Sequence, residues 1–283
     1  MQSVQDTFKL VNGVSIPCVG FGTWRTPDGE VAVSSVEAAL DAGYRHIDTA
    51  AAYGNEKSVG IAIKKSGISR KDIFVTSKLH NTDHGYENTL RAFENTLAEL
   101  DMDYLDLYLI HWPNPIFFRE RWKEANAGSW KAFEELYEAG RIKAIGVSNF
   151  RSHHLDALME TAKVAPMVNQ IRLCPGDVHQ ETVTYCKARN ILLEAYSPLG
   201  VGRIFDVPEL KKIAQAHGKT EAQVSLRWSL QNGFLPLPKS VTPSRIQENA
   251  GLFDFALSDG EMAAISALRD CCGVARDPDA TDF

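Results

Sequence analysis

Eight short apolar segments alternate along this chain with segments of helical periodicity. Most of the apolar segments are continuously apolar, which is the pattern of strands that are buried on both faces. Between them, side chains such as Val33, Val36 and Leu40 recur at the spacing of one helix face. The strand-like segments are Cys18–Phe21, His46–Asp48, Ile73–Ser77, Tyr104–Ile110, Ile142–Val147, Met167–Ile171, Ile191–Ala195 and Phe234–Leu237. The chain is therefore predicted to be an α/β protein.

The number of strands narrows the choice of architecture. Eight strand–helix units in 283 residues match the size and pattern of a (β/α)8 TIM barrel, and a doubly wound open sheet is the main rival. Ahead of the first unit, Phe8–Ile16 is predicted to form a β-hairpin around Asn12 and Gly13, a pair that favours a type I′ turn. No linker or shift in composition interrupts the chain, so residues 1–283 are predicted to form a single barrel domain.

The composition argues against several classes of partner. Lys and Arg number 30 against 36 Asp and Glu, a net charge of −6, and no basic run is longer than two, so no nucleic-acid partner is expected. No apolar stretch reaches the ~18 to 20 residues of a membrane span, and the first residues lack a signal-peptide pattern. The five cysteines have no CxxC spacing, as in proteins with reduced thiols. We expect a cytoplasmic monomer that binds small molecules and no membrane.

Two segments are candidates for binding a phosphate-bearing ligand. Residues 20–25 (GFGTWR) begin like the dinucleotide motif G-x-G-x-x-G, but Arg25 stands where the third glycine is needed, which argues against a Rossmann-type site. The better candidate follows the eighth strand, where Thr242 is predicted to be the N-cap of a helix. Barrels commonly hold phosphate at such a helix, and Lys239 and Arg245 add two cations there. Taken alone, these cations fit a solvated basic face equally well.

Four polar side chains lie at or just after the ends of successive predicted strands. Asp48 ends the second strand, Tyr53 follows five residues later, Lys78 ends the third strand and His111 ends the fourth. Strand ends meet at one mouth of a barrel, so these residues are predicted to be neighbours. Lys78, oriented by Asp48, would lower the pKa of Tyr53 from its usual ~10 and make it a better proton donor. His111 would donate a hydrogen bond to a carbonyl oxygen.

The motifs around these residues resemble those of a known family. A resemblance to the first signature of the aldo-keto reductase superfamily lies in residues 43–50 (GYRHIDTA), 53–56 (YGNE) and 59–60 (VG). A resemblance to its cofactor-phosphate signature lies in residues 237–240 (LPKS), Arg245, Glu248 and Asn249. Between them, in order, lie TSK at 76–78, DLYLIHWP at 106–113, GVSNF at 146–150, VNQ at 168–170 and AYSPLG at 195–200. The short tail is similar to those of bacterial members, including the 2,5-diketo-D-gluconate reductase-like group.

This resemblance implies NADPH-dependent reduction of aldehydes or ketones to alcohols. It implies Tyr53 as the general acid, Lys78 and Asp48 as the residues that tune it, and His111 as the residue that orients the substrate. The implied cofactor contacts run from the nicotinamide to the 2′-phosphate and the adenine: Gly22, Thr23, Trp24, Asp48, Ser148, Asn149, Gln170, Tyr196, Ser197, Leu199, Gly200, Lys239, Ser240, Val241, Thr242, Arg245, Glu248 and Asn249. The implied substrate contacts are Trp24, Tyr53, His80, His111 and Trp112.

Some features depart from the family pattern or leave alternatives open. His80 stands where relatives often have tryptophan, and residues 172–175 (RLCP) differ from a common ExHP loop. His80 and His84 lack the glutamate of a zinc-protease motif, so no metal is expected. Two rival functions are a barrel aldolase that forms a Schiff base through Lys78 and an NADPH-binding regulatory subunit with weak turnover. Small aldehydes, dicarbonyls and keto-sugars all remain candidate substrates.

Overall fold

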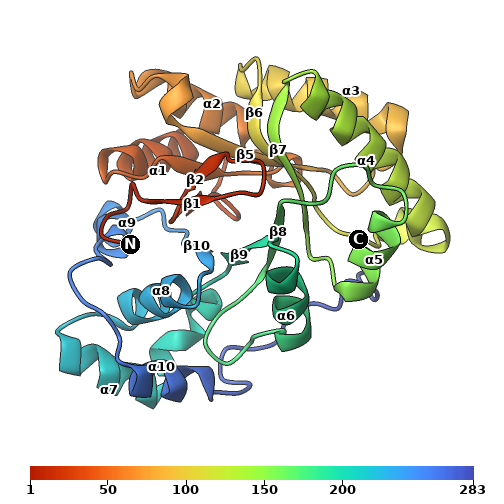
Figure 1. Cartoon of the computed structure of the whole chain (residues 1–283). Coiled ribbons are helices and arrows are strands. Elements are labelled where there is room, and N and C mark those ends of the chain that lie inside the picture. Colours follow the sequence, from red (N-terminus) through yellow and green to blue (C-terminus); the bar gives the residue numbers. More distant parts are fainter.

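The computed structural model describes residues 1–283 and contains an eight-stranded parallel sheet surrounded by helices (Figure 1). Its strands are β3 (Phe21–Gly22), β4 (His46–Asp48), β5 (Phe74–Leu79), β6 (Leu105–Ile110), β7 (Ile142–Ser148), β8 (Val168–Arg172), β9 (Leu192–Tyr196) and β10 (Leu235–Leu237). They pair in chain order, with β3 and β10 at the two edges. The N–H of Gly20 donates to the backbone oxygen of Pro236 at 3.1 Å, and that of Gly22 to Pro238 at 3.0 Å. These bonds join the edges into a nearly closed barrel, so the predicted (β/α)8 fold is confirmed and the open sheet is wrong.

The first strand is shorter than predicted because the barrel closes there. The predicted strand was Cys18–Phe21, but only Phe21 of that segment and the next residue, Gly22, pair with β4. A Cβ atom on Gly20 would lie 2.6 Å from His46 Nδ1, so only glycine allows the chain to pass this point. Gly20 is therefore needed where the barrel closes, and it is not part of a dinucleotide-binding motif.

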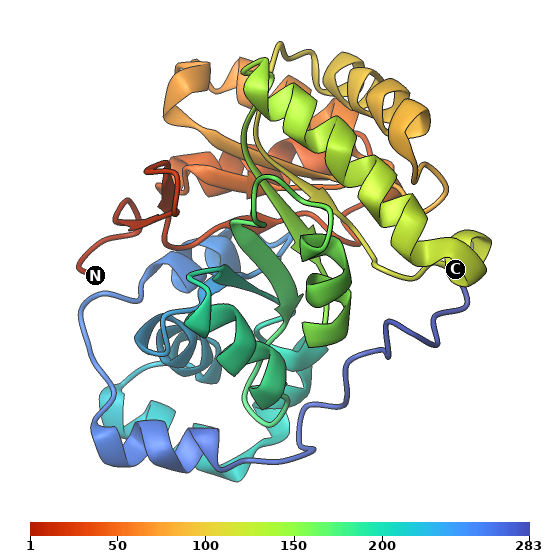
Figure 2. The ribbon, with the colours of Figure 1, turned by 45° about the vertical axis from the view of Figure 1, so that its right-hand side comes forward.

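Helices cover the outside of the barrel (Figures 1 and 2). The α-helices are α1 (Glu30–Asp41), α2 (Glu56–Lys65), α3 (Tyr86–Leu100), α4 (Trp122–Glu138), α5 (Ser152–Met159), α6 (Gln180–Ala188), α7 (Pro208–His217), α8 (Glu221–Gln231), α9 (Pro243–Ala250) and α10 (Asp259–Ser266). Short 3-10 helices are η1 (Ala51–Tyr53), η2 (Arg70–Asp72), η3 (Ile116–Arg121) and η4 (Gly200–Asp206). As predicted for its apolar stripe, α1 buries Val36 and Leu40. None of the helices combines the length and the apolar character needed to cross a bilayer.

The predicted hairpin is present, with a different turn. Strands β1 (Thr7–Lys9) and β2 (Ser15–Pro17) pair antiparallel. Gly13 has a φ of +85° but Asn12 has no positive φ, so the turn is not type I′. Instead, Asn12 Nδ2 donates to the backbone oxygen of Lys143 at 3.0 Å, near the start of β7. This tertiary contact ties the hairpin to the amino-terminal end of the barrel, opposite the strand ends that carry the candidate site.

The last residues run as an extended segment from α10 to the start of η3 (Figure 2). The backbone oxygen of Phe283 accepts a hydrogen bond from Ile116 N–H at 3.0 Å, and the Phe283 ring meets Trp112 edge-on at 5.1 Å. On the way, this segment passes Cys271 and Cys272, whose Sγ atoms are 3.7 Å apart; all five cysteines are free thiols. The segment therefore reaches the mouth of the barrel.

Gly60 offers a stability test of helix packing. A Cβ atom on Gly60 in α2 would overlap the carbonyl of Leu100 at the end of α3. Although alanine favours a helix over glycine by ~1 kcal/mol, we expect Gly60→Ala to lower the free energy of unfolding by about 1 to 3 kcal/mol in urea denaturation. The matched control is Gly260→Ala in α10, where nothing lies within 4 Å of the new atom, and it should stabilise the protein. Equal effects of the two changes would contradict the packing argument.

His84 makes stability depend on pH. Its buried ring stacks on Phe118 with centroids 5.4 Å apart, and burial lowers its pKa from 6.5 to about 3. Between these two values the unfolded chain binds a proton that the folded chain does not, so the free energy of unfolding falls as the pH falls. We expect His84→Leu to reduce this dependence by about 1 kcal/mol per pH unit between pH 6 and 4, measured by urea denaturation. His80→Leu, in the same loop, is the control, and identical pH slopes for both variants would refute the expectation.

Candidate active site

The carboxyl ends of the barrel strands bring the predicted catalytic residues together. Asp48 ends β4, Lys78 lies in β5, and Tyr53 ends η1 just after β4. Lys78 Nζ donates hydrogen bonds to both carboxylate oxygens of Asp48 at 2.8 Å, to the backbone oxygen of Thr49 at 2.8 Å and to Tyr53 Oη at 3.3 Å. His111 follows β6, and its ring meets the Tyr53 ring edge-on with centroids 5.8 Å apart. The four residues predicted from the strand ends thus lie in one group, which we call the tetrad.

Lys78 is a buried charge with a complete set of partners. It is 0% exposed, and burial alone would favour the neutral amine. Asp48 and Tyr53 act in the opposite direction and together raise the pKa of Lys78 above its usual value. The side chain is therefore a fixed ammonium group held between a carboxylate and a phenol.

Tyr53 has a higher pKa than the sequence predicted. Burial raises the pKa of Tyr53 above 10, Lys78 lowers it and Asp48 raises it again, so the net direction is upward. The expectation of a lowered net value is wrong because the desolvation of the phenolate outweighs the attraction of one ammonium group. Tyr53 consequently holds its proton at neutral pH, and Lys78 lies where it would stabilise a phenolate.

His111 is a neutral ring at the same mouth. Burial lowers the pKa of His111 well below 6.5, and the positive charge of Lys78 acts in the same direction. Its Nδ1 atom is buried and has no hydrogen-bond partner. A neutral imidazole keeps one N–H group, so His111 is suited to donating a hydrogen bond without bringing a charge.

Beneath this group, the expected cofactor contact Gln170 meets polar residues of the barrel interior to which the sequence assigned no role, namely His46, Thr76 and Glu194. Gln170 Nε2 donates to Asp48 Oδ2 and to Glu194 Oε2, both at 2.8 Å. His46 Nε2 lies 2.9 Å from Thr76 Oγ1 and 3.9 Å from Glu194 Oε1. A polar column therefore runs from the tetrad into the barrel, where branched apolar side chains are the rule.

Glu194 and His46 are buried in their neutral forms. Burial raises the pKa of Glu194 to about 8, and the charge of Asp48 adds to the rise, while Gln170 and Lys78 oppose it. Burial lowers the pKa of His46 to about 3, and Lys78 acts in the same direction. The sequence signal for Glu194 was a single acidic residue within an apolar strand segment.

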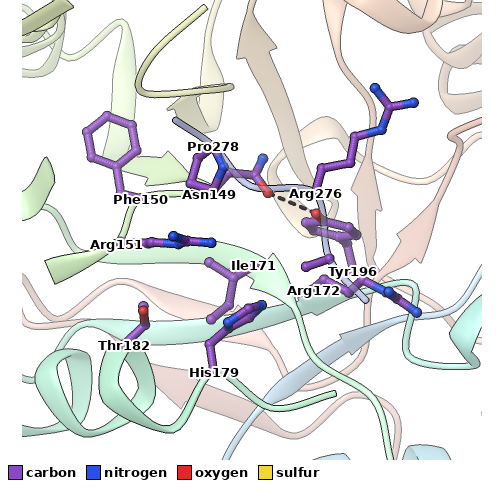
Figure 3. Close-up of a pocket in the computed structure, with 11 residues that line it drawn as sticks. Asn149, Phe150, Arg151, Ile171, Arg172, His179, Thr182, Tyr196, Arg276 and Pro278 are labelled. Carbon is purple, nitrogen blue, oxygen red and sulfur yellow. Dashed lines mark hydrogen bonds between the residues drawn. The ribbon is translucent and has the colours of Figure 1, made fainter. Parts of the chain in front are cut away.

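Residues at the ends of β7, β8 and β9 form a second group. Asn149 Nδ2 donates to the backbone oxygen of His111 at 3.0 Å and to Ser148 Oγ at 3.1 Å. Ser148 Oγ in turn donates to the backbone oxygen of Gln170 at 2.8 Å. Tyr196 Oη donates to Asn149 Oδ1 at 2.9 Å, as Figure 3 shows. Asn149 has a φ of +64°, in the left-handed region that asparagine adopts more readily than most other non-glycine residues.

The loop after β3 is held against the tetrad. Thr23 Oγ1 donates to the backbone oxygen of Asp48 at 3.0 Å, so this side chain points into the protein rather than into the mouth. Asn55 Nδ2 donates to the backbone oxygen of Thr23 at 3.0 Å and ties the loop to the segment after Tyr53. Gly22 is buried, whereas Trp24 is 43% exposed at the rim.

Cations gather between β3 and β10. Lys239 Nζ donates to the backbone oxygen of Arg25 at 3.2 Å, and burial together with the charge of Arg25 lowers the pKa of Lys239. The Arg25 guanidinium stacks on Trp24 at 4.5 Å. Arg245 and Val241 are exposed in and just before α9. Arg25 was missed as a basic residue because the sequence motif drew attention only to the glycine it replaces.

The other residues predicted at the phosphate and adenine end differ in whether their side chains are free to bind a ligand. Thr242 is the N-cap of α9, as predicted, but its side chain makes no capping bond, and its N–H donates to Ser240 Oγ at 3.0 Å. Glu248 Oε1 accepts a hydrogen bond from Thr220 Oγ1 at 2.9 Å, at the N-cap of α8. Asn249 is buried. Glu248 is thus already engaged in joining α8 to α9.

The loop after β9 packs under the C-terminal segment. Ser197 and Gly200 have φ angles of +47° and +55°, and Leu199 is half-buried. A Cβ atom on Gly200 would lie 2.7 Å from Cys272 Cβ, so glycine permits this contact. On the substrate side, His80 Nδ1 lies 2.8 Å from Thr82 Oγ1, and Trp112 is buried against the end of the chain.

A cluster of His153, His154 and Asp279 has metal-like spacing, with its ligand atoms within 4.8 Å of one another. His154 Nδ1 accepts a hydrogen bond from Arg151 N–H at 3.1 Å, so Nε2 carries the proton that it donates to Asp279 Oδ1 at 2.8 Å. A protonated nitrogen has no lone pair for a metal. The cluster therefore acts as a clamp on the C-terminal segment.

Comparison with known proteins agrees with this arrangement. The chain matches the aldo/keto reductase family over residues 18–270. It is 49% identical to glyoxal reductase of Bacillus subtilis over 98% of both chains. The structure of MGS-M4, an aldo-keto reductase from a Medee basin deep-sea metagenome library, is 44% identical and superposes with a TM-score of 0.92 over 98% of this chain and all of that one. A variant of Gox0644 in complex with NADPH is 39% identical, with a TM-score of 0.90 over 99% of both chains. This chain belongs to the aldo/keto reductase family.

Proposed function

We propose that this protein reduces aldehydes and ketones to alcohols with NADPH, and that Tyr53 is the general acid. The observation that carries the proposal is the contact between the Tyr53 hydroxyl and the buried Lys78 ammonium group at 3.3 Å. A proton donor needs a stabilised conjugate base, and this contact supplies one at the barrel mouth. The family membership of the chain supports a reaction on a carbonyl group.

The residues around the mouth fit NADPH by the chemistry of their donor groups. Lys239, Arg25 and Arg245 are cations for its phosphates, and the first amides of α9 lack a side-chain cap, as a helix-terminal anion site requires. Ser148, Asn149 and Gln170 would hold the carboxamide, with Tyr196 against the ring. Thr23 and Glu248 already make hydrogen bonds within the protein and Asn249 is buried, so we assign these three mainly to support of the site. The Gox0644 complex, at 39% identity, supports NADPH as the ligand.

The chain's own residues then have defined tasks. A bound NADPH supplies the hydride that the carbonyl carbon accepts. His111 donates a hydrogen bond to the carbonyl oxygen as negative charge develops there. Tyr53 gives its hydroxyl proton to that oxygen, Lys78 stabilises the resulting phenolate, and a proton from solvent restores the phenol.

The state of Lys78 argues against the aldolase alternative. A Schiff base requires an unprotonated amine, but Asp48 and Tyr53 raise the pKa of Lys78 and its Nζ donates to four oxygen atoms. A regulatory subunit with weak turnover would not need a complete proton-donating group, so the regulatory alternative leaves this group unexplained. We therefore favour the reductase over both.

Small aldehydes and dicarbonyls are the substrate class that we propose. Trp24, Ile116 and Phe117 are exposed apolar side chains in the mouth loops after β3 and β6, and the relative named glyoxal reductase shares 49% identity. The half-buried His80 adds a polar group to this rim. The net charge of −6 argues against a nucleic-acid partner, and we propose a monomeric enzyme of the cytoplasm.

The Tyr53→Phe variant tests the general acid. It keeps the ring but removes the proton, so we expect kcat with NADPH and glyoxal to fall by ~10² to 10⁴ while NADPH binding stays within about twofold. Absorbance at the nicotinamide band measures turnover, and fluorescence titration measures binding. Tyr86→Phe, on the outer surface of α3, is the control. Turnover that survives in Tyr53→Phe would refute this role.

The Arg245→Gln variant tests recognition of the 2′-phosphate. Loss of a guanidinium contact to phosphate should raise the KM for NADPH about tenfold and leave the KM for NADH nearly unchanged, because NADH lacks that phosphate. Arg269→Gln, an exposed arginine after α10, is the control for a general change of charge. Equal increases for both cofactors would contradict the assignment.

A further inference from the structure

Glu194 is a buried carboxyl group that two hydrogen bonds, both through Gln170, connect to the tetrad. It lies in β9, is 0% exposed and pairs in register with Gln170 of β8. Its Oε2 atom accepts a hydrogen bond from Gln170 Nε2 at 2.8 Å, while its Oε1 atom has no partner. Burial of a carboxyl group costs stability unless the group is hydrogen-bonded, and here only one of its two oxygens is.

The Gln170 amide has only one favourable orientation. Its two N–H groups donate to two carboxyl oxygens, Asp48 Oδ2 and Glu194 Oε2, each at 2.8 Å. If the amide were turned over, its carbonyl oxygen would face the Asp48 carboxylate, which can only accept a hydrogen bond. The observed orientation leaves Gln170 Oε1 without a hydrogen bond in the protein, while the Ser148 hydroxyl group bonds to the Gln170 backbone oxygen instead.

We propose that Glu194 is a positioning residue that, together with Asp48, orients the amide of Gln170 so that its carbonyl oxygen accepts the carboxamide N–H of the nicotinamide cofactor. This inference rests on the proposed NADPH function and assigns a task to a residue outside the tetrad. Glu194 touches neither cofactor nor substrate and acts through Gln170 alone.

The neutral form of Glu194 suits this task. Burial raises its pKa to about 8, with a further rise from Asp48, so the group is a carboxylic acid at neutral pH. A neutral acid accepts the Gln170 N–H without placing a second negative charge beside Asp48. The Asp48 carboxylate is then free to be neutralised by Lys78.

The sharpest probe is a cofactor that lacks the carboxamide N–H. The 3-acetylpyridine analogue of NADP⁺ carries a methyl ketone in place of the carboxamide, so it cannot donate to Gln170 Oε1. The ratio of its Kd to that of NADP⁺, measured by calorimetry, reports this one hydrogen bond. General damage to the protein weakens both ligands together and leaves the ratio unchanged.

We expect Glu194→Met to reduce this discrimination ratio about three- to tenfold relative to the unmodified protein, because the Gln170 amide loses one of its two acceptors. Glu194→Gln restores an acceptor oxygen and should bring the ratio back to within about twofold. Thr76→Val, which removes a polar group from the same interior and leaves Gln170 untouched, is the control. Glu194→Asp, whose side chain is one methylene shorter, gives a second test. Its discrimination ratio should lie between those of Glu194→Met and Glu194→Gln.

Three results overturn the inference in distinguishable ways. An unchanged ratio in both Glu194→Met and Glu194→Asp, with NADP⁺ still bound, rejects the role of Glu194 and leaves the proposed function intact. Failure of the unmodified protein to bind NADP⁺ rejects the proposed function and the inference with it. A ratio that falls equally in Thr76→Val also rejects the inference, because the effect would then belong to the barrel interior in general.

Discussion

The buried ion pair of Lys78 and Asp48 is the interaction on which the candidate site depends. Removal of an ammonium group and a carboxylate from water costs several kcal/mol for each ion, and only close geometry with further hydrogen bonds offsets this cost. Here both carboxylate oxygens lie 2.8 Å from Nζ, and Thr49 and Tyr53 provide the remaining acceptors. Burial lowers the pKa of His111, the charge of Lys78 lowers it further, and the same charge lowers the pKa of Tyr53 against the effect of burial. The proton donor that we propose at the mouth therefore depends on this pair.

Closure of the barrel brings the Lys78 and Asp48 side chains together in its interior. Gly20 lets the first and last strands meet beside His46, and the closed sheet then turns alternate residues of β4, β5, β8 and β9 inward. The inward side chains form a polar column that ends at Glu194, where apolar branched residues would normally pack. The column costs stability, and hydrogen bonds through Gln170 compensate for part of that cost. Function and stability therefore compete for the same interior positions.

Local patterns were sufficient for the strands and for the residues at their ends. Continuous apolar segments placed all eight strands, with the main error at Cys18–Phe21, because closure of the barrel acts there through distant residues. The prediction of a type I′ turn at Asn12 was wrong for a similar reason. The Asn12 side chain bonds to the backbone of the distant residue Lys143, and the local preference of an Asn-Gly pair does not include this contact. The lowered pKa expected for Tyr53 was also wrong, because the sequence contains the identity of Lys78 but not the depth of burial.

The sequence by itself determined the alternation of strands and helices, the order of the motifs and the four polar residues at the strand ends, because these depend on spacing along the chain. Tertiary structure alone decided which polar groups meet inside the barrel. In the sequence, Glu194 is a single acidic residue in an apolar strand segment. Only the register of β8 and β9 places it beside Gln170. Likewise, Arg25 joins Lys239 only because the first and last strands close the sheet. Electrostatic effects depend on distance and burial in three dimensions, and spacing along the chain does not contain either quantity.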